Sequence, residues 1–60
     1  MYIVEIIDTK NKTRAGKAFF TGEGEDYDTL AAGRAAAEEW VKSTDSPEDY
    51  KIISRIVGCL

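Results

Sequence analysis

Hydrophobic and polar residues follow one another along this chain in patterns that predict three strands and one helix. The segment Tyr2 to Ile7 is rich in β-branched residues and has apolar side chains on both faces, which is typical of a central strand. The polar segment Asp8 to Gly16 contains turn-forming residues, so we expect a hairpin loop there. Lys17 to Thr21, with its two adjacent phenylalanines, predicts the second strand.

A helix is predicted from Leu30 to about Ser43, because apolar side chains fall on one face when plotted at about 100° per residue. That face carries Leu30, Gly33, Ala37, Trp40 and Val41. Asp28 or Thr29 can cap the first free backbone amides of this helix. The segment 44–49, which contains Pro47, ends the helix, and Tyr50 to Val57 predicts the last strand.

The order strand, strand, helix, strand limits the topology. We expect residues 1–60 to form a single domain, because domains rarely have fewer than about 50 residues. A right-handed crossover makes the third strand parallel to the second, and the hairpin makes the second antiparallel to the first. With the apolar first strand in the centre, we expect an α+β fold, ββαβ, whose three-stranded antiparallel sheet has the order 2-1-3 and one helix on one face. The order 1-2-3 is the alternative.

Charge is distributed unevenly along the sequence. The net charge is −3, with 43% hydrophobic and 32% charged residues, which is typical of a folded protein. Four basic residues lie in one short stretch with no acid among them: Lys10, Lys12, Arg14 and Lys17. The rest of the chain holds eleven acids against four bases. We therefore expect no direct DNA binding, except through this basic hairpin.

Three absences indicate where the protein acts. No apolar run reaches the roughly 18 residues of a membrane span, so no membrane partner is expected. The N-terminus lacks the features of a signal peptide, and the lone Cys59 cannot form an internal disulfide. The sequence predicts a cytoplasmic protein, in the host cytoplasm if it is encoded by a phage.

Enzymatic chemistry is not expected, and no cofactor is implied. The chain has no histidine, which removes the commonest general base at neutral pH. Cys59 has no evident partner base and is interpreted as a small apolar residue that ends a strand. Neither a metal nor a phosphate site is predicted. The acids between Glu23 and Asp28 do not have calcium-loop spacing, and Gly22-x-Gly24 lacks the lysine of a phosphate loop.

Binding is therefore the expected activity, and the first candidate surface is acidic. We expect the partner-binding residues to be Glu23, Glu25, Asp26, Tyr27, Asp28, Glu38, Glu39, Asp45, Glu48 and Asp49. A surface of this kind can compete with DNA for a basic groove or dock on a basic protein patch. Tyr27, in a loop among acids, is the expected anchor of the contact. The alternative is a surface that only keeps the protein soluble.

The second candidate surface is the sheet face turned away from the helix. A single helix covers one face only, which leaves Ile3, Ile7, Ile53 and Val57 on the other. An apolar patch rimmed by charge marks an interaction site or a self-association face. The protein could then be a monomer, or a homodimer acting as a small structural or oligomerisation module.

The second half of the sequence resembles the small RNA polymerase inhibitor of podoviruses. The similarity lies in Thr29-Leu30, an alanine-rich helix that ends in Glu39-Trp40, and the closing strand from Ile53 to Val57. It needs a one-residue shift in the helix and a longer loop between helix and strand. The resemblance implies that Arg55 matches an arginine that contacts the partner.

In size, acidity and lack of catalytic residues, the chain is also similar to anti-CRISPR proteins of phages and mobile elements. Many of these block the crRNA-guided surveillance complex by occupying its DNA-binding surface. This similarity fits the acidic surface better, and the polymerase inhibitor fits the helix and strand pattern better. We therefore expect an inhibitor that binds a host protein or ribonucleoprotein complex with a basic surface, the CRISPR surveillance complex first and RNA polymerase second.

Overall fold

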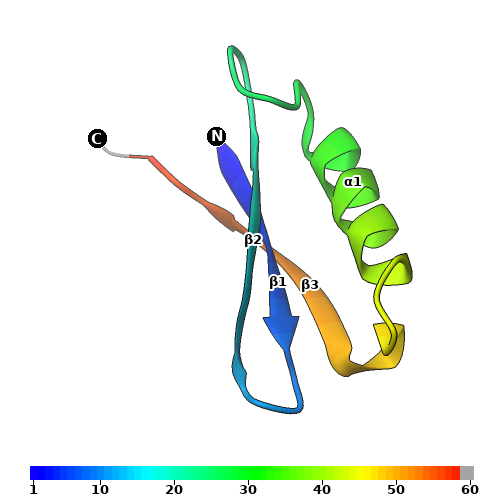
Figure 1. The fold of residues 1–60 in the computed structure, drawn as a ribbon. Coiled ribbons are helices and arrows are strands. Elements are labelled where there is room, and N and C mark those ends of the chain that lie inside the picture. The colour runs from blue at the N-terminus through cyan, green and yellow to red at the C-terminus, as the bar shows by residue number, and fades with distance from the viewer. Residues whose placement is uncertain (59–60) are drawn as a thin grey trace.

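The structure, a computed structural model that describes residues 1–58, has two layers, a sheet and a helix (Figure 1). Its elements are β1 Tyr2–Asp8, β2 Thr13–Thr21, α1 Leu30–Lys42, the short 3-10 helix η1 Pro47–Asp49 and β3 Tyr50–Ile56. The strand order is β2-β1-β3, and β1 is antiparallel to both neighbours. The predicted α+β fold and its 2-1-3 order are confirmed. Cys59, predicted to end the last strand, lies outside the described residues.

The second strand begins earlier than the sequence indicates, at Thr13 rather than Lys17. Thr13 pairs with Asp8 and Arg14 with Ile7, and the register shifts between Glu5 and Ile7. The Asp8 carboxylate accepts the backbone N–H groups of the two residues that follow Thr9, at 3.0 and 3.1 Å. This tight turn shortens the predicted loop and lets β2 pair almost to the hairpin tip.

The core lies between β1, β2 and α1. Val4 and Ile6 project from β1 toward the helix and are fully buried, as the alternation of side chains along a strand requires. They pack with Phe19, Ala37 and Val41. The predicted helix face is therefore the buried one, with Leu30 and Trp40 at its margin.

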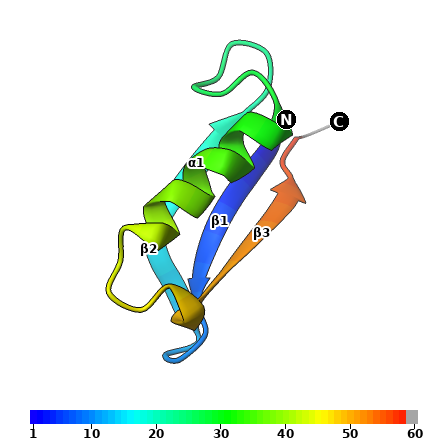
Figure 2. The ribbon, with the colours of Figure 1, turned by 90° about the vertical axis from the view of Figure 1, so that its right-hand side faces the viewer.

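Hydrogen bonds made by Thr29 and Ser43 cap the two ends of α1. Thr29 is the N-cap, and its Oγ1 accepts the N–H of Ala32 at 3.1 Å, so Thr29 rather than Asp28 fills this role. At the other end, the Ser43 N–H donates to the carbonyl groups of Glu39 and Trp40. Seen from the helix side, α1 lies in front of β2 and β1, with β3 to one side (Figure 2). The helix therefore covers the sheet unevenly.

Candidate functional site

Among residues 1–58 the structure has no pocket. In that same part of the chain, no group of three or more histidine, cysteine, aspartate or glutamate side chains is placed to hold a metal ion. No helix formed by the described residues is long and apolar enough to span a bilayer. The two candidates that the sequence predicts are both surfaces.

The loop between β2 and α1 presents four acids to solvent at one end of the molecule. Gly22 and Gly24 adopt positive φ angles of 139° and 84°, which glycine tolerates best. Gly22 donates to the Tyr27 carbonyl at 2.8 Å, and the N–H of Tyr27 donates back to Phe20 at 3.3 Å. The loop therefore returns to the end of β2. Its exposed acids are Glu23, Glu25, Asp26 and Asp28.

Tyr27 has a different environment from the one expected of a partner anchor. Its ring is half-buried and packs edge-to-face against Phe19, with 5.7 Å between the ring centroids. Its backbone also forms a parallel bridge with Thr21. Tyr27 therefore ties the acidic loop to the core and has only part of its ring free to meet a partner. The sequence alone does not reveal this, because the contact depends on how the loop returns to β2.

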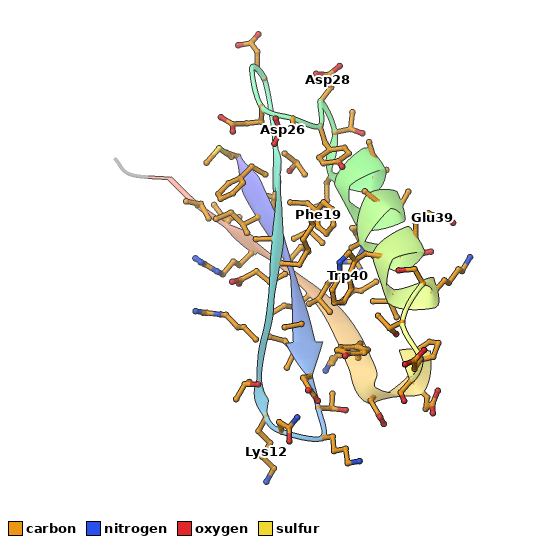
Figure 3. The ribbon with its side chains drawn as sticks, viewed as in Figure 1. Lys12, Phe19, Asp26, Asp28, Glu39 and Trp40 are labelled. Atoms are coloured by element: carbon orange, nitrogen blue, oxygen red, sulfur yellow. The ribbon has the colours of Figure 1, made fainter. Side chains whose placement is uncertain are left out.

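The remaining predicted acids extend from the helix to the segment that follows it. Glu38, Glu39, Asp45 and Glu48 are exposed. Asp49 is half-buried, and its carbonyl accepts both the N–H and the Oγ1 of Thr9 at 2.8 Å. Figure 3 shows Asp26 and Asp28 at one end of the molecule and Glu39 on the outer side of α1. The acids thus follow the length of the helix.

These nine carboxylates share one layer of the molecule, here called the helical layer and defined as residues 22–49. Within the described part of the chain, none of the nine forms an ion pair. The helical layer holds only two bases, Arg34 and Lys42. It therefore has a net charge of −7, carried by groups that are free to meet a cationic partner.

The opposite charge gathers in the strand layer, defined as the three strands and the β1–β2 hairpin. This layer holds six of the eight bases and only two acids, Glu5 and Asp8. The six are Lys10, Lys12, Arg14, Lys17, Lys51 and Arg55. From the sequence alone, only the four basic residues of the hairpin are predicted to lie close together. Pairing of β3 with β1 adds Lys51, opposite Ile7, and Arg55, opposite Ile3.

One buried acid organises the sheet face that the helix does not cover. The Glu5 side chain is only 9% exposed and forms ion pairs with the Nε atoms of Arg14 at 3.1 Å and Arg55 at 2.8 Å. Both arginine side chains are at least half exposed. The sequence signal is Glu5, the one acid in the predicted strand Tyr2 to Ile7, but its partners depend on strand register.

This ion-paired triad changes the interpretation of the predicted apolar patch. Ile3 is buried on that face, and Ile7, Ile53 and Val57 are buried or half-buried rather than open to solvent. Glu5 lies between Ile3 and Ile7 along β1 and pairs with Ile53 across the sheet. The patch is therefore divided by charge at its centre, which makes it a poor face for dry apolar packing.

Comparison of the chain with family models, with curated proteins and with solved structures finds no match. The function of the chain is therefore inferred from the surface chemistry of the described residues.

Proposed function

We propose that this protein is a non-enzymatic inhibitor that places its helical layer on the basic surface of a nucleic-acid-processing complex and thereby excludes DNA. The observation that carries this proposal is the set of nine unpaired carboxylates along one layer. Carboxylates that form no ion pair within the protein can form ion pairs with lysine and arginine side chains of a partner. Electrostatic potentials of opposite sign on two protein surfaces also accelerate their association.

The dimensions of the molecule suit competition for a stretch of a DNA-binding groove. Its longest axis is 35 Å, about one turn of B-DNA. A duplex of that length carries about 20 phosphates at one charge per 1.7 Å, against nine carboxylates here. The helical layer therefore matches part of the charge of the DNA and displaces it from a subset of its contacts. Binding of this kind weakens as salt rises, because exposed charges are screened.

The proposed target is a ribonucleoprotein or protein complex whose DNA-binding groove is accessible before DNA arrives. The similarity to anti-CRISPR proteins makes the CRISPR surveillance complex the first candidate. The similarity to the podovirus inhibitor makes bacterial RNA polymerase the second. In both cases the protein acts in the cytoplasm of the bacterial host, and the proposed contact residues are the acids of the helical layer.

The test uses purified surveillance complex and purified bacterial RNA polymerase, each mixed at the same time with labelled DNA and with the protein, so that the two compete for the groove. The wild-type protein should displace DNA from one of them, less effectively at high salt. A triple variant, Glu25→Gln with Asp26→Asn and Asp28→Asn, should displace less. The control, Thr13→Lys with Ala18→Lys and Phe20→Lys, raises the net charge equally but in the strand layer, and should displace as the wild type does. Equal displacement by the neutralised variant, or no displacement from either complex, would contradict the proposal.

A further inference from the structure

The two edges of the sheet differ in how well they are protected from pairing with another strand. On β2, the register shift opposite Glu5–Ile7 bends the strand, and Gly16 has a positive φ of 82°. The end of β2 is closed by the bridge between Thr21 and Tyr27. Bulges and covering loops are devices that proteins use to block edge-to-edge association. The β2 edge is therefore protected.

The β3 edge lacks these devices. From Tyr50 to Ile56 each residue pairs with β1 in an unbroken register, and this segment contains neither proline nor glycine. The Val57 N–H donates to the Met1 carbonyl at 2.9 Å. Because backbone groups alternate in direction along an antiparallel strand, those of Ile52, Ser54 and Ile56 point outward. Within residues 1–58 these outward groups bond to no other segment.

Apolar side chains are exposed beside this open edge. Ile56 is 73% exposed, and Tyr2, with which it pairs on β1, is 38% exposed. The end of β3, at Ile56, lies to one side of α1 rather than beneath it (Figure 2). Arg34 extends from the helix toward the strand, where its Nη1 donates to the Ser54 Oγ at 3.3 Å. An unpaired, regular edge with exposed isoleucine is the arrangement that favours addition of a strand.

We propose that the occupant of this edge is the β3 strand of a second copy of the chain, paired antiparallel about a two-fold axis at Ser54. An isologous contact requires a self-complementary surface, and this register provides one. It places Ile52 opposite the partner subunit's Ile56 on the helix side, with both residues directing their backbone groups across the new edge. Ser54 lies opposite the partner subunit's Ser54, and the backbone groups of both residues also point across the new edge.

Charge selects this register over its neighbour. A two-fold axis at Ile53 would place Lys51 opposite the partner subunit's Arg55, and like charges directly opposite one another are destabilising. With the axis at Ser54, Lys51 is opposite the partner subunit's Val57 and Arg55 is opposite the partner subunit's Ile53. The edge contact also leaves the Arg14–Glu5–Arg55 triad undisturbed, whereas face-to-face packing of two sheets would bury it.

The dimer has a continuous six-stranded sheet with both helices on the same side. The two helical layers would then form one extended acidic surface, and the basic residues of both copies would remain on the strand layers. Because each Arg34 donates to its own Ser54, the two Arg34 side chains approach one another at the axis. Glu38, one helical turn further on the same flank of α1, supplies the opposite charge that offsets this repulsion. This dimer does not depend on the proposed inhibitory function.

Sedimentation velocity from micromolar to millimolar concentration tests the proposal. The wild type should form a dimer, and Ile56→Lys should weaken association at least about tenfold, or about 1.4 kcal/mol. Phe20→Lys, on the open face near the β2 edge, is the matched control and should dimerise like the wild type. A monomer over the whole range would overturn the proposal. So would loss of the dimer in Phe20→Lys but not in Ile56→Lys, which would place the contact on the open face.

A cross-linking experiment locates the two-fold axis independently of any loss of folding. In a Cys59→Ser background, Ser54→Cys should link two copies through a short bismaleimide, because residues on the axis are about 5.5 Å apart in a hydrogen-bonded pair. Ser43→Cys, exposed at the end of α1, should link only at the rate of random collision. Equal linking at the two positions would contradict the Ser54 register.

Discussion

Gly33 of α1 lies directly against Thr21 of β2, so that a Cβ atom at position 33 would overlap the Thr21 Cγ2. The same Cβ would also be 3.4 Å from Val4. The helix backbone therefore rests on the sheet without an intervening side chain. This close approach brings Ala37 and Val41 into the core, where larger residues at position 33 would hold them away.

Gly33→Ala should destabilise the protein by about 1–3 kcal/mol through overpacking, although alanine favours a helix by about 1 kcal/mol over glycine. Denaturant unfolding would measure this loss. Thr21→Ser removes the Cγ2 and keeps the hydroxyl that donates to the Tyr2 carbonyl at 3.0 Å. The double variant should therefore recover much of the stability lost by Gly33→Ala. Additive losses in the double variant would show that the overlap is not the cause.

The N-cap of α1 provides a second prediction. Thr29→Ala should lower the free energy of unfolding by about 1 kcal/mol, since it removes the acceptor of the Ala32 N–H. Asp28→Asn should change stability by less than about 0.5 kcal/mol, because Asp28 is exposed and does not cap the helix. Thermal unfolding of both variants would compare them. A larger effect at Asp28 would contradict the observed cap.

A third prediction concerns Glu5 and its two arginines. A double-mutant cycle that combines Glu5→Gln with Arg55→Met should give a coupling energy of about 0.5–1 kcal/mol. The coupling energy is small because the Arg55 side chain is half exposed, so that solvent screens the ion pair. The corresponding cycle with Arg14→Met should give a smaller value, since Arg14 is more exposed and its distance is longer. Equal or reversed coupling would show that exposure does not control the strength of these pairs.

The hairpin turn makes stability depend on acid pH. The Asn11 side chain, Nδ2 donating at 2.8 Å, holds the pKa of Asp8 below its ordinary value, helped by the backbone N–H groups of Asn11 and Lys10. Since the folded-state pKa is lowered, the linked stability is present above the unfolded-state pKa. It is lost as the pH falls through the folded-state pKa.

Asn11→Ala should therefore raise the pKa of Asp8 toward the ordinary value. A carbon NMR titration of the Asp8 carboxyl group would measure the change. Lys12→Asn is the control, because asparagine tolerates the positive φ of 59° at that position and Lys12 makes no hydrogen bond to Asp8. It should leave the Asp8 titration close to that of the wild type. Identical titrations in wild type and Asn11→Ala would contradict the assigned cause.

Local patterns were sufficient to predict most of the fold. The apolar face of α1 and the two apolar faces of β1 are properties of short segments, so helix bounds and strand order could be inferred without knowing any distant contact. The start of β2 was missed because Gly16 and its polar neighbours have the composition of a loop. Only pairing of Thr13 with Asp8 makes them a strand.

The candidate site was less predictable because its chemistry depends on contacts between distant residues. The exposure of the nine acids of the helical layer follows from their charge, and all but Asp49 are exposed. The half-burial of Tyr27 depends on Phe19 and Thr21, and the Glu5 triad depends on residues 14 and 55. No periodicity or motif links positions that are so far apart in the sequence.

The Arg14–Glu5–Arg55 triad takes one member from each strand, and its Glu5–Arg55 bond joins residues 50 positions apart. During synthesis, β1 and β2 emerge first and can form a hairpin, but a two-stranded hairpin is only marginally stable in water. The central strand gains its second neighbour only when residues 50–56 leave the ribosome. Closing that long loop lowers the conformational entropy of the chain before the Glu5–Arg55 contact can contribute to stability. The complete triad can therefore form only after residues 50–56 have left the ribosome, which makes it a marker of a late step in the folding of this sheet.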